Sequence, residues 1–243
     1  WRNPFIDTTH HPAKDRFHLC YPASSYDEPA RVCFFINKRL DHTKWQFKAH
    51  TRDMCTLTIT GDANNSLPVN IHNIYNTTQN TENRRSVLPQ LRQTLHEQRD
   101  SEQILLGDFN LHHELWGGTA VDRADHEAGE LINIIEDFDL TNTLQPGTIT
   151  YEEGERRTTI DLCLVTLGLV DRLIRSEVDR EFDHDSDHLP IITALDLKAI
   201  CLEAKVRRKW KALDEKMFNA RLQRELPPLR RPRTKAALDR YVQ

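Results

Sequence analysis

The sequence predicts an α/β fold, a four-layer sandwich of two packed mixed β-sheets flanked by helices, with a C-terminal helical extension. Three observations predict it. Short runs rich in β-branched and aromatic residues recur between residues 32 and 197, two segments with apolar residues at helical spacing lie among them, and the chain becomes strongly charged after residue 197. We therefore expect one α/β domain over residues 1–197 and a basic helical linker over residues 198–243.

The first expected elements are strands joined as hairpins. Residues 32–37 form a short β-branched and aromatic run. Residues 54–60 alternate, with apolar side chains on one face and threonines on the other. Glycine, aspartate and asparagine over residues 61–65 signal a turn, and residues 69–75 begin to alternate again.

Helices and strands alternate along the rest of the chain. Apolar residues at helical spacing predict helices over residues 84–99 and 127–138. A charged segment over residues 203–226 has the same period and is stopped by Pro227-Pro228. Further strands are expected over residues 103–107, 148–151, 159–166 and 189–197.

Composition narrows the class of protein. Hydrophobic residues make up 38% and charged residues 29% of the chain, and no run of about 18 apolar residues is present, so no membrane span is expected. A charged-then-apolar leader is also absent, which argues against secretion and for an intracellular protein. The five cysteines are scattered without Cys-x-x-Cys spacing, so neither a zinc site nor a disulfide framework is expected.

Charge is divided unequally along the chain. From Lys198 onward there are 14 Lys and Arg against 5 Asp and Glu, a net of +9, and the preceding residues hold 19 against 32, a net of −13. An acidic body cannot coat nucleic acid indiscriminately, because each neutralised phosphate needs a cation. A local metal site and a basic stripe remain compatible with this division, and the basic segment is alternatively a linker with a solvated face.

Three acidic clusters follow or interrupt apolar runs, in an order that suits phosphodiester cleavage. Polar groups at the ends of neighbouring strands converge on one cleft, where carboxylate and amide oxygens can hold Mg²⁺ beside an imidazole. Taken singly, an Asp-x-Asn after a strand is more often a turn whose side chains bond their own backbone, and a lone Asp-His pair is as readily surface polarity. The clusters are Gly107-Asp108-Phe109-Asn110, Thr159-Ile160-Asp161-Leu162 and Ser186-Asp187-His188-Leu189-Pro190.

This arrangement resembles the endonuclease/exonuclease/phosphatase superfamily, which includes the apurinic endonucleases and deoxyribonuclease I. The run Gly107-Asp108-Phe109-Asn110-Leu111-His112-His113-Glu114-Leu115-Trp116-Gly117 resembles more closely the endonuclease domain of non-LTR (LINE-type) retrotransposons. The resemblance implies a deoxyribonuclease I-like fold and a DNA-nicking enzyme that uses Mg²⁺ or Mn²⁺. It also implies DNA as a partner, a reverse transcriptase domain in the same polyprotein, target-primed reverse transcription, and action in the nucleus.

The resemblance carries roles onto matching residues. Asp108 and Asn110 match the pair that positions the attacking water and holds phosphate or metal. Asp187 matches a metal ligand, and His188 matches the residue that contacts the scissile phosphate. Asp161 matches the carboxylate that orients this histidine, although a strand-edge Asp paired with an arginine such as Arg157 is the alternative.

Four further residues are candidates for contacts with DNA. Tyr75 matches a cleft tyrosine that donates to phosphate, and the alternative is plain packing at a strand end. His112, His113 and Trp116 are expected on a loop above the cleft, where a ring can stack on a base and imidazoles can meet phosphates. The alternative is a loop whose Trp fills the rim of the core, while zinc is disfavoured because the other ligands are missing.

One departure from the family pattern bears on activity. An Asn after the first strand and a metal-binding Glu after the second have no match ahead of Phe5, and Trp1 fits the end of the Gln-Glu-Pro-Trp-like run that carries this Glu. We therefore expect a chain truncated at its front that binds metal weakly. An inactive retroelement remnant is one alternative function, and a phosphomonoesterase or phospholipid phosphodiesterase is another, which the His-His-Glu-Leu-Trp run disfavours.

Overall fold

The computed structural model describes residues 12–22, 29–60, 67–77, 85–181, 186–197 and 214–225. The chain divides into two compact units, Trp1–Glu203 and Ala204–Gln243. Within the part of the chain that is described, no helix is long and apolar enough to cross a membrane.

The first unit is built on a six-stranded central sheet. Its strand order is β3-β4-β5-β6-β10-β7, and only the β5–β6 pair is parallel. The parallel pair is possible because a helix, α1, carries the chain back between them, whereas β3, β4 and β5 follow one another as antiparallel neighbours. The strands are β3 (Trp45–Thr51), β4 (Met54–Ile59), β5 (Val69–Tyr75), β6 (Glu102–Asp108), β10 (Asp161–Thr166) and β7 (Leu140–Asn142).

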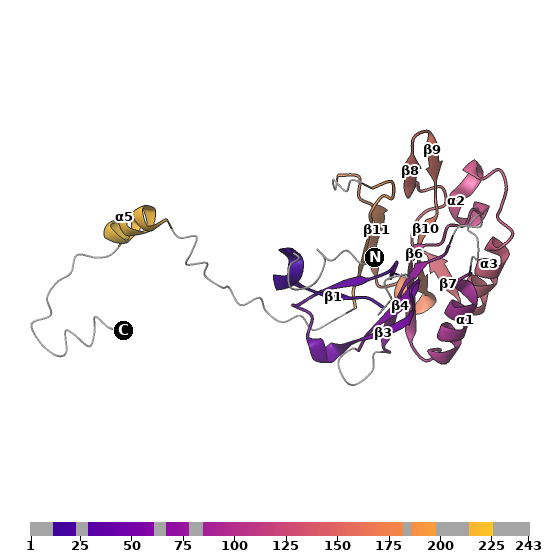
Figure 1. Cartoon of the computed structure of the whole chain (residues 1–243), viewed down its shortest axis with the longest axis horizontal. Helices are drawn as coiled ribbons and strands as arrows, with labels where there is room; N and C mark the ends of the chain where they lie inside the picture. The colour runs from indigo at the N-terminus through magenta and orange to yellow at the C-terminus, as the bar shows by residue number, and fades with distance from the viewer. Residues whose placement is uncertain are drawn as a thin grey trace, which may run out of the picture. The chain divides into compact units, whose positions relative to one another are not determined.

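Two helices cover one face of this sheet, α1 (Leu88–Glu97) and α3 (Ala128–Asp137) (Figure 1). The apolar stripe of each helix packs on alternate residues of the strands, as helical and strand periodicities require. The resulting apolar core includes Leu88, Leu91, Leu131, Ile134, Ile74, Leu105 and Leu162.

The other face of the sheet meets a second, two-stranded sheet, β11 (Leu173–Val178) paired with β12 (Ile191–Leu195). Leu195 of β12 and Leu169 of α4 (Leu167–Val170) join a smaller apolar cluster with Ile104 and Cys163 of the central sheet. Two sheets therefore pack face to face with helices outside, and the predicted α/β sandwich is confirmed.

Every strand predicted from the sequence is present within a few residues. The two helices predicted over residues 84–99 and 127–138 are present as α1 and α3, and both are shorter than predicted. Of the helix expected over residues 203–226, the described part is α5 (Glu215–Glu225), and the rest lies outside the described residues. Elements without a sequence prediction are η2 (Pro12–Asp15), β1 (Phe17–Cys20), η3 (His42–Lys44), β3, α2 (Glu114–Gly117), η4 (Gly118–Ala120), β7, β9 (Arg156–Thr158), α4 and β11. The remaining strands are β2 (Phe34–Asn37), which pairs with β1, and β8 (Tyr151–Glu153), which pairs with β9.

The threonine face of β4 is as buried as its apolar face. Thr56 is 0% exposed, and its hydroxyl lies 2.8 Å from His50 Nε2 and 2.8 Å from His72 Nδ1. His72 Nε2 lies 2.8 Å from Gln103 Oε1, and Gln103 Nε2 donates to the carbonyl of Gln98 at 2.7 Å. A chain of hydrogen bonds thus satisfies the buried polar groups beneath α1, as a low-dielectric interior demands.

Candidate active site

A row of polar side chains crosses three neighbouring strands at one edge of the central sheet. Tyr75 ends β5 and is the register partner of Asp108, which ends β6, and Asp108 is the partner of Asp161, which begins β10. Register partners point to the same face of a sheet. Ile104 and Cys163 lie on this face too, by strand alternation, so the row points toward the second sheet.

Gly107 allows β5 and β6 to approach closely just before this row. Its φ is +132°, and a Cβ at this position would overlap the carbonyl oxygen of Ile74. Both conditions exclude an L side chain. The glycine of the Gly107-Asp108-Phe109-Asn110 run therefore sets the spacing between Tyr75 and Asp108.

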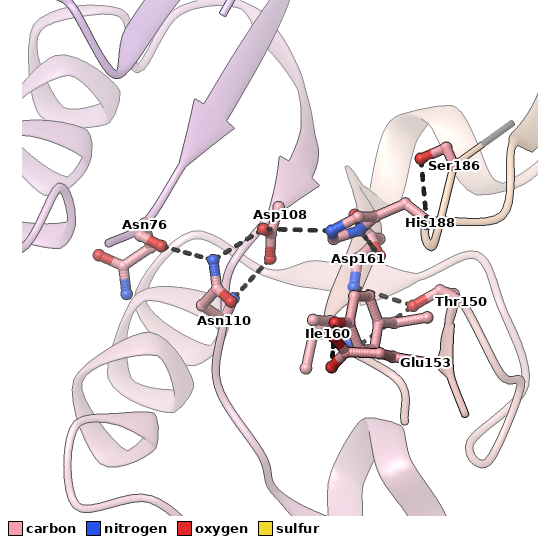
Figure 2. Close-up of polar contacts among 10 residues, drawn as sticks. Asn76, Asp108, Asn110, Thr150, Glu153, Ile160, Asp161, Ser186 and His188 are labelled. Atoms are coloured by element: carbon pink, nitrogen blue, oxygen red, sulfur yellow. Dashed lines mark hydrogen bonds and ion pairs between the residues drawn. The ribbon is translucent and has the colours of Figure 1, made fainter. Parts of the chain in front are cut away.

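Asn110 is held against Asp108 by a tight turn. The Asn110 backbone N–H donates to Asp108 Oδ1 at 2.9 Å, and its side-chain Nδ2 donates to Asp108 Oδ2 at 2.7 Å and to the Asn76 carbonyl at 2.8 Å (Figure 2). Asn110 has φ +50°, a left-handed conformation that asparagine tolerates better than most residues. The alternative to a functional role for this run was a turn whose side chains bond their own backbone. This turn does form, and its hydrogen bonds fix both Asp108 and Asn110.

The His188 imidazole pairs with the Asp161 carboxylate. His188 Nδ1 lies 2.9 Å from Asp161 Oδ2 and 3.1 Å from Oδ1 (Figure 2). Thr150 joins the two segments, because its hydroxyl accepts from the Asp161 N–H at 3.0 Å and its carbonyl accepts from the Leu189 N–H at 2.7 Å. Asp161 therefore pairs with the histidine rather than with Arg157, which lies exposed in β9.

Burial and neighbouring charges change the protonation of this group of residues. Desolvation, followed by the negative charge of Asp161, raises the pKa of Asp108 to about 7. The hydrogen bond to Asp161 raises the pKa of His188 above its ordinary value, against the opposing effect of its own burial. Asp108 is thus a carboxyl group that can take up and release a proton near neutral pH.

A gap separates the two titratable groups that face each other across the site. His188 Nε2 lies 4.0 Å from Asp108 Oδ2, which is too long for a hydrogen bond. The Tyr151 ring packs edge-on against the imidazole, with centroids 4.8 Å apart and planes at 68°, and restricts its rotation. A water or phosphate oxygen in this gap can contact both groups, the arrangement that proton transfer at a phosphoryl centre needs.

Asp187 offers a carboxylate for a divalent metal. It lies exposed next to His188, and its carbonyl accepts from the Glu152 N–H at 2.8 Å. Among the described residues, no group of three or more His, Cys, Asp or Glu side chains is close enough to hold an ion. These residues do not form a closed protein cage, but Mg²⁺ is commonly held by one or two carboxylates with water and substrate phosphate, which an exposed Asp187 suits.

The loop after Asn110 differs in part from the expectation. Trp116 is 2% exposed, belongs to the core beneath α3, and donates its indole N–H to the Leu111 carbonyl at 2.8 Å. Its ring is therefore not available to stack on a base, and the expectation of nucleic-acid binding by Trp116 is wrong, because the apolar ring gains more from the core. The alternative, a Trp at the rim of the core, describes the structure.

The two histidines of this loop are half-buried and take part in local contacts. The backbone N–H of His112 donates to Asp125 Oδ2 at 2.7 Å, and its Nδ1 lies 3.0 Å from the same oxygen. His113 Nδ1 accepts from the Leu115 N–H at 3.1 Å and caps α2. Contact of His112 and His113 with DNA remains a prediction.

Three residues of the site have no sequence prediction. Asn76 and Thr150 are both 0% exposed and anchor Asn110 and Asp161, and Tyr151 packs on His188. Asn76 could have been found from the sequence, because it directly follows Tyr75 at the end of a predicted strand. Thr150 and Tyr151 depend on which strands meet, which local sequence does not specify.

Solved structures share this fold at low sequence identity. The endonuclease domain of TRAS1, a telomere-specific non-LTR retrotransposon, is 15% identical over 75% of this chain and 81% of its own, with a TM-score of 0.58. The 3′ phosphatase NExo from Neisseria, bound to a product DNA hairpin, is 16% identical over 79% of this chain and 85% of its own, with a TM-score of 0.54. The 3′-5′ exonuclease NExo from Neisseria meningitidis is 16% identical, covering 79% and 86%, with a TM-score of 0.55. No curated protein sequence matches this chain.

The fold is that of the endonuclease/exonuclease/phosphatase superfamily, a class of hydrolases whose nucleases generally depend on a divalent metal. The profile of the endonuclease-reverse transcriptase family matches residues 69–192, the segment that contains the whole row from Tyr75 to His188. The chain belongs to this family.

Proposed function

We propose that the chain is the Mg²⁺-dependent (or Mn²⁺-dependent) DNA-nicking endonuclease domain of a retrotransposon polyprotein. A reverse transcriptase domain of the same polyprotein would extend the 3′ hydroxyl that the nick releases, in the nucleus. The observation that carries the proposal is the gap between Asp108 and His188, with the imidazole held by Asp161 and the carboxylate held by Asn110. The family description adds the link to reverse transcription.

The side chains of the site divide the chemistry of hydrolysis between them. Asp108, with a pKa of about 7, accepts a proton from the attacking water as the oxygen approaches phosphorus. His188 Nε2 points toward the same gap and donates a hydrogen bond to a phosphate oxygen, on which negative charge grows. Asp161 keeps the proton on His188 Nδ1, so the ring presents a fixed edge to the substrate.

Asp187 would hold the divalent metal, with water and substrate phosphate as the other ligands. The metal would neutralise part of the phosphate charge in the transition state. The exposed carboxylate supports this assignment, because its site opens to solvent rather than into the protein.

The basic segment after residue 197 would supply much of the non-specific affinity for DNA. Its net charge of +9 contrasts with −13 for the rest of the chain. Electrostatic affinity of this kind falls steeply with salt. A chain that ends at Leu197 should therefore bind duplex DNA more weakly and with a shallower salt dependence than the full chain; equal affinity and equal salt slope would show that the segment is a linker only.

Nicking of supercoiled plasmid tests the enzymatic proposal. With protein in excess over DNA and Mg²⁺ present, Asp187→Ala and His188→Ala should each slow the conversion to open circles by about 100-fold or more. EDTA should abolish conversion. His42→Ala is the matched control for loss of an imidazole, because the His42 side chain is 78% exposed and lies in a short 3-10 helix outside the site.

Nicking that proceeds equally in both site variants would refute the proposed roles. Release of inorganic phosphate from a 3′-phosphorylated oligonucleotide, without nicking, would instead point to the phosphomonoesterase alternative. Absence of both reactions in the unsubstituted chain, folded by circular dichroism, would favour the inactive remnant.

A further inference from the structure

The polar row of the active site continues across one more strand. Asp53 lies in the turn between β3 and β4, and its backbone carbonyl accepts a hydrogen bond from the Tyr75 backbone N–H at 2.9 Å. Its carboxylate faces Arg31, which lies before β2 and has no part in the chemistry described so far. The order Asp53, Tyr75, Asp108, Asp161 therefore runs across four adjacent strands or turns, with Arg31 above its first two members.

Arg31 is fixed at both ends of its guanidinium group. Its Nε and one terminal nitrogen donate to the two oxygens of Asp53, the latter bond being 2.6 Å long. The same terminal nitrogen donates to Thr77 Oγ1 at 2.7 Å, and the Arg31 backbone N–H donates to the Arg52 carbonyl at 2.8 Å. A bidentate fork with an additional bond leaves the group little freedom to slide.

The fixed guanidinium lies over the Tyr75 ring. Its central carbon is 4.3 Å from the ring centroid, within the range of a cation–π contact. Tyr75 is itself next to Asp108 in the sheet register, on the same face. The Arg31 guanidinium covers one face of the Tyr75 ring, and the backbone of Tyr75 is fixed in β5. The Tyr75 hydroxyl can therefore point in only a narrow range of directions.

We infer that Arg31, braced by Asp53 and Thr77, is a positioning residue that holds the Tyr75 ring at the row of active-site side chains. The inference rests on the proposed function and on the role that the family resemblance implies for Tyr75, whose hydroxyl would donate to a phosphate oxygen. Arg31 acts through Tyr75 and not on the substrate. The bidentate bonds to Asp53 fix the plane of the Arg31 guanidinium over the Tyr75 ring, so its planar shape and fixed position carry this role.

Three variants separate this role from a general contribution to stability. Arg31→Met removes the fork and keeps most of the side-chain volume, and Arg31→Lys keeps the charge but loses the planar fork. Arg92→Met is the control for loss of an arginine–aspartate ion pair, because Arg92 makes a single bond to Asp137 between α1 and α3, away from the site. Unfolding in urea shows which variants remain folded.

The first readout is the environment of Tyr75 itself, which does not require activity. The chain has five tyrosines, so ring-labelled tyrosine gives a simple NMR spectrum in which Tyr75→Phe identifies the Tyr75 resonance. This resonance should move in Arg31→Met and in Arg31→Lys, and should stay in place in Arg92→Met. A Tyr75 resonance that ignores both Arg31 variants would overturn the inference.

The second readout is single-turnover nicking. Arg31→Met should lower the rate at saturating DNA by about tenfold, the scale of one lost charge-assisted hydrogen bond, with little change in the DNA concentration at half-saturation. Arg31→Lys should restore less than half of the loss. In a Tyr75→Phe background the effect of Arg31→Met should shrink to less than about twofold, because the two residues act as one unit.

The outcomes distinguish the two proposals. An undiminished effect of Arg31→Met in the Tyr75→Phe background would overturn the positioning role while the endonuclease proposal stands. A folded, unsubstituted chain that never nicks DNA would overturn the endonuclease proposal, and the role of Arg31 in that reaction with it.

Discussion

Acidification should act on this fold through two buried groups that titrate in opposite directions. His72 is 0% exposed beneath α1, and Asp108 is buried at the active site with a side chain 13% exposed. One is a base kept neutral and the other is an acid kept neutral. Their contributions to the pH dependence of stability should nearly cancel in the unsubstituted chain.

His72 makes the folded chain less stable as pH falls. Desolvation lowers its pKa from 6.5 to about 4, and Gln103 Oε1, which can only accept, fixes its proton on Nε2 while Nδ1 accepts from Thr56. Between these two pKa values the unfolded chain binds a proton that the folded chain does not. Stability is therefore lost as pH falls through this window, at about 1.4 kcal/mol per pH unit and about 3 kcal/mol in all.

Asp108 has the opposite sign. Desolvation and the charge of Asp161 raise its pKa from 3.8 to about 7, so the folded chain binds a proton in this window that the unfolded chain has released. Stability is therefore gained as pH falls, again at about 1.4 kcal/mol per pH unit. The pKa of His188 is raised by its bond to Asp161, so its contribution to stability is fully present well below its ordinary pKa and is lost only as pH rises.

Urea unfolding at several pH values between about 4.5 and about 6.0 separates the two contributions. Relative to the unsubstituted chain, His72→Gln should gain about 2 kcal/mol toward acid over this range, and Asp108→Asn should lose about 2 kcal/mol. Each substitution also changes the free energy of unfolding by an amount that does not depend on pH. The prediction concerns only how the free energy of unfolding changes with pH. His42→Gln, which removes an exposed imidazole, is the control. Slopes that tilt in the same direction in both variants, or that do not change, would refute the reasoning.

Three other substitutions have expected outcomes. Gly107→Ala should destabilise the chain by about 3 kcal/mol in urea unfolding, since its Cβ would overlap the Ile74 carbonyl at a positive φ. Trp116→Phe should cost about 2 kcal/mol through the lost bond to Leu111 and the lost volume, yet leave DNA affinity of the folded chain unchanged in a fluorescence binding titration. Asp161→Asn should slow single-turnover plasmid nicking by about 100-fold or more, with stability nearly retained, because the imidazole loses its negatively charged partner and the amide NH2 can donate to Nδ1 and fix the other tautomer.

The position of the site carboxylates was predictable because they lie at strand ends that the sequence marks clearly. Asp108 and Asp161 directly border apolar runs, and strands that carry such runs must lie in the middle of a sheet. Their convergence then follows from the fold class. The same reasoning had no access to Arg31 or Thr150, because their partners come from segments far away in the chain.

Trp116 shows a second limit of sequence reasoning. A short motif gives the types of residue and their order, but the direction of each side chain depends on what the core can absorb. An apolar ring with one N–H near a free carbonyl is stabilised by burial, and Leu111 supplies that carbonyl. β3 was not predicted, although Trp45, Phe47 and Ala49 alternate with polar residues along it and its backbone pairs with β4.

The alignment of Tyr75, Asp108 and Asp161 in one register makes activity a direct report on strand pairing during folding. A slip of β10 against β6 by one residue would turn Asp161 to the helix-covered face and Leu162 toward His188, because side chains alternate along a strand. Such a misfolded chain would keep nearly all of its secondary structure, so its far-ultraviolet circular dichroism spectrum would match that of the native chain. During refolding, recovery of nicking should therefore lag behind recovery of secondary structure whenever the sheet first pairs out of register, and the amplitude of the lagging phase measures how often it does so.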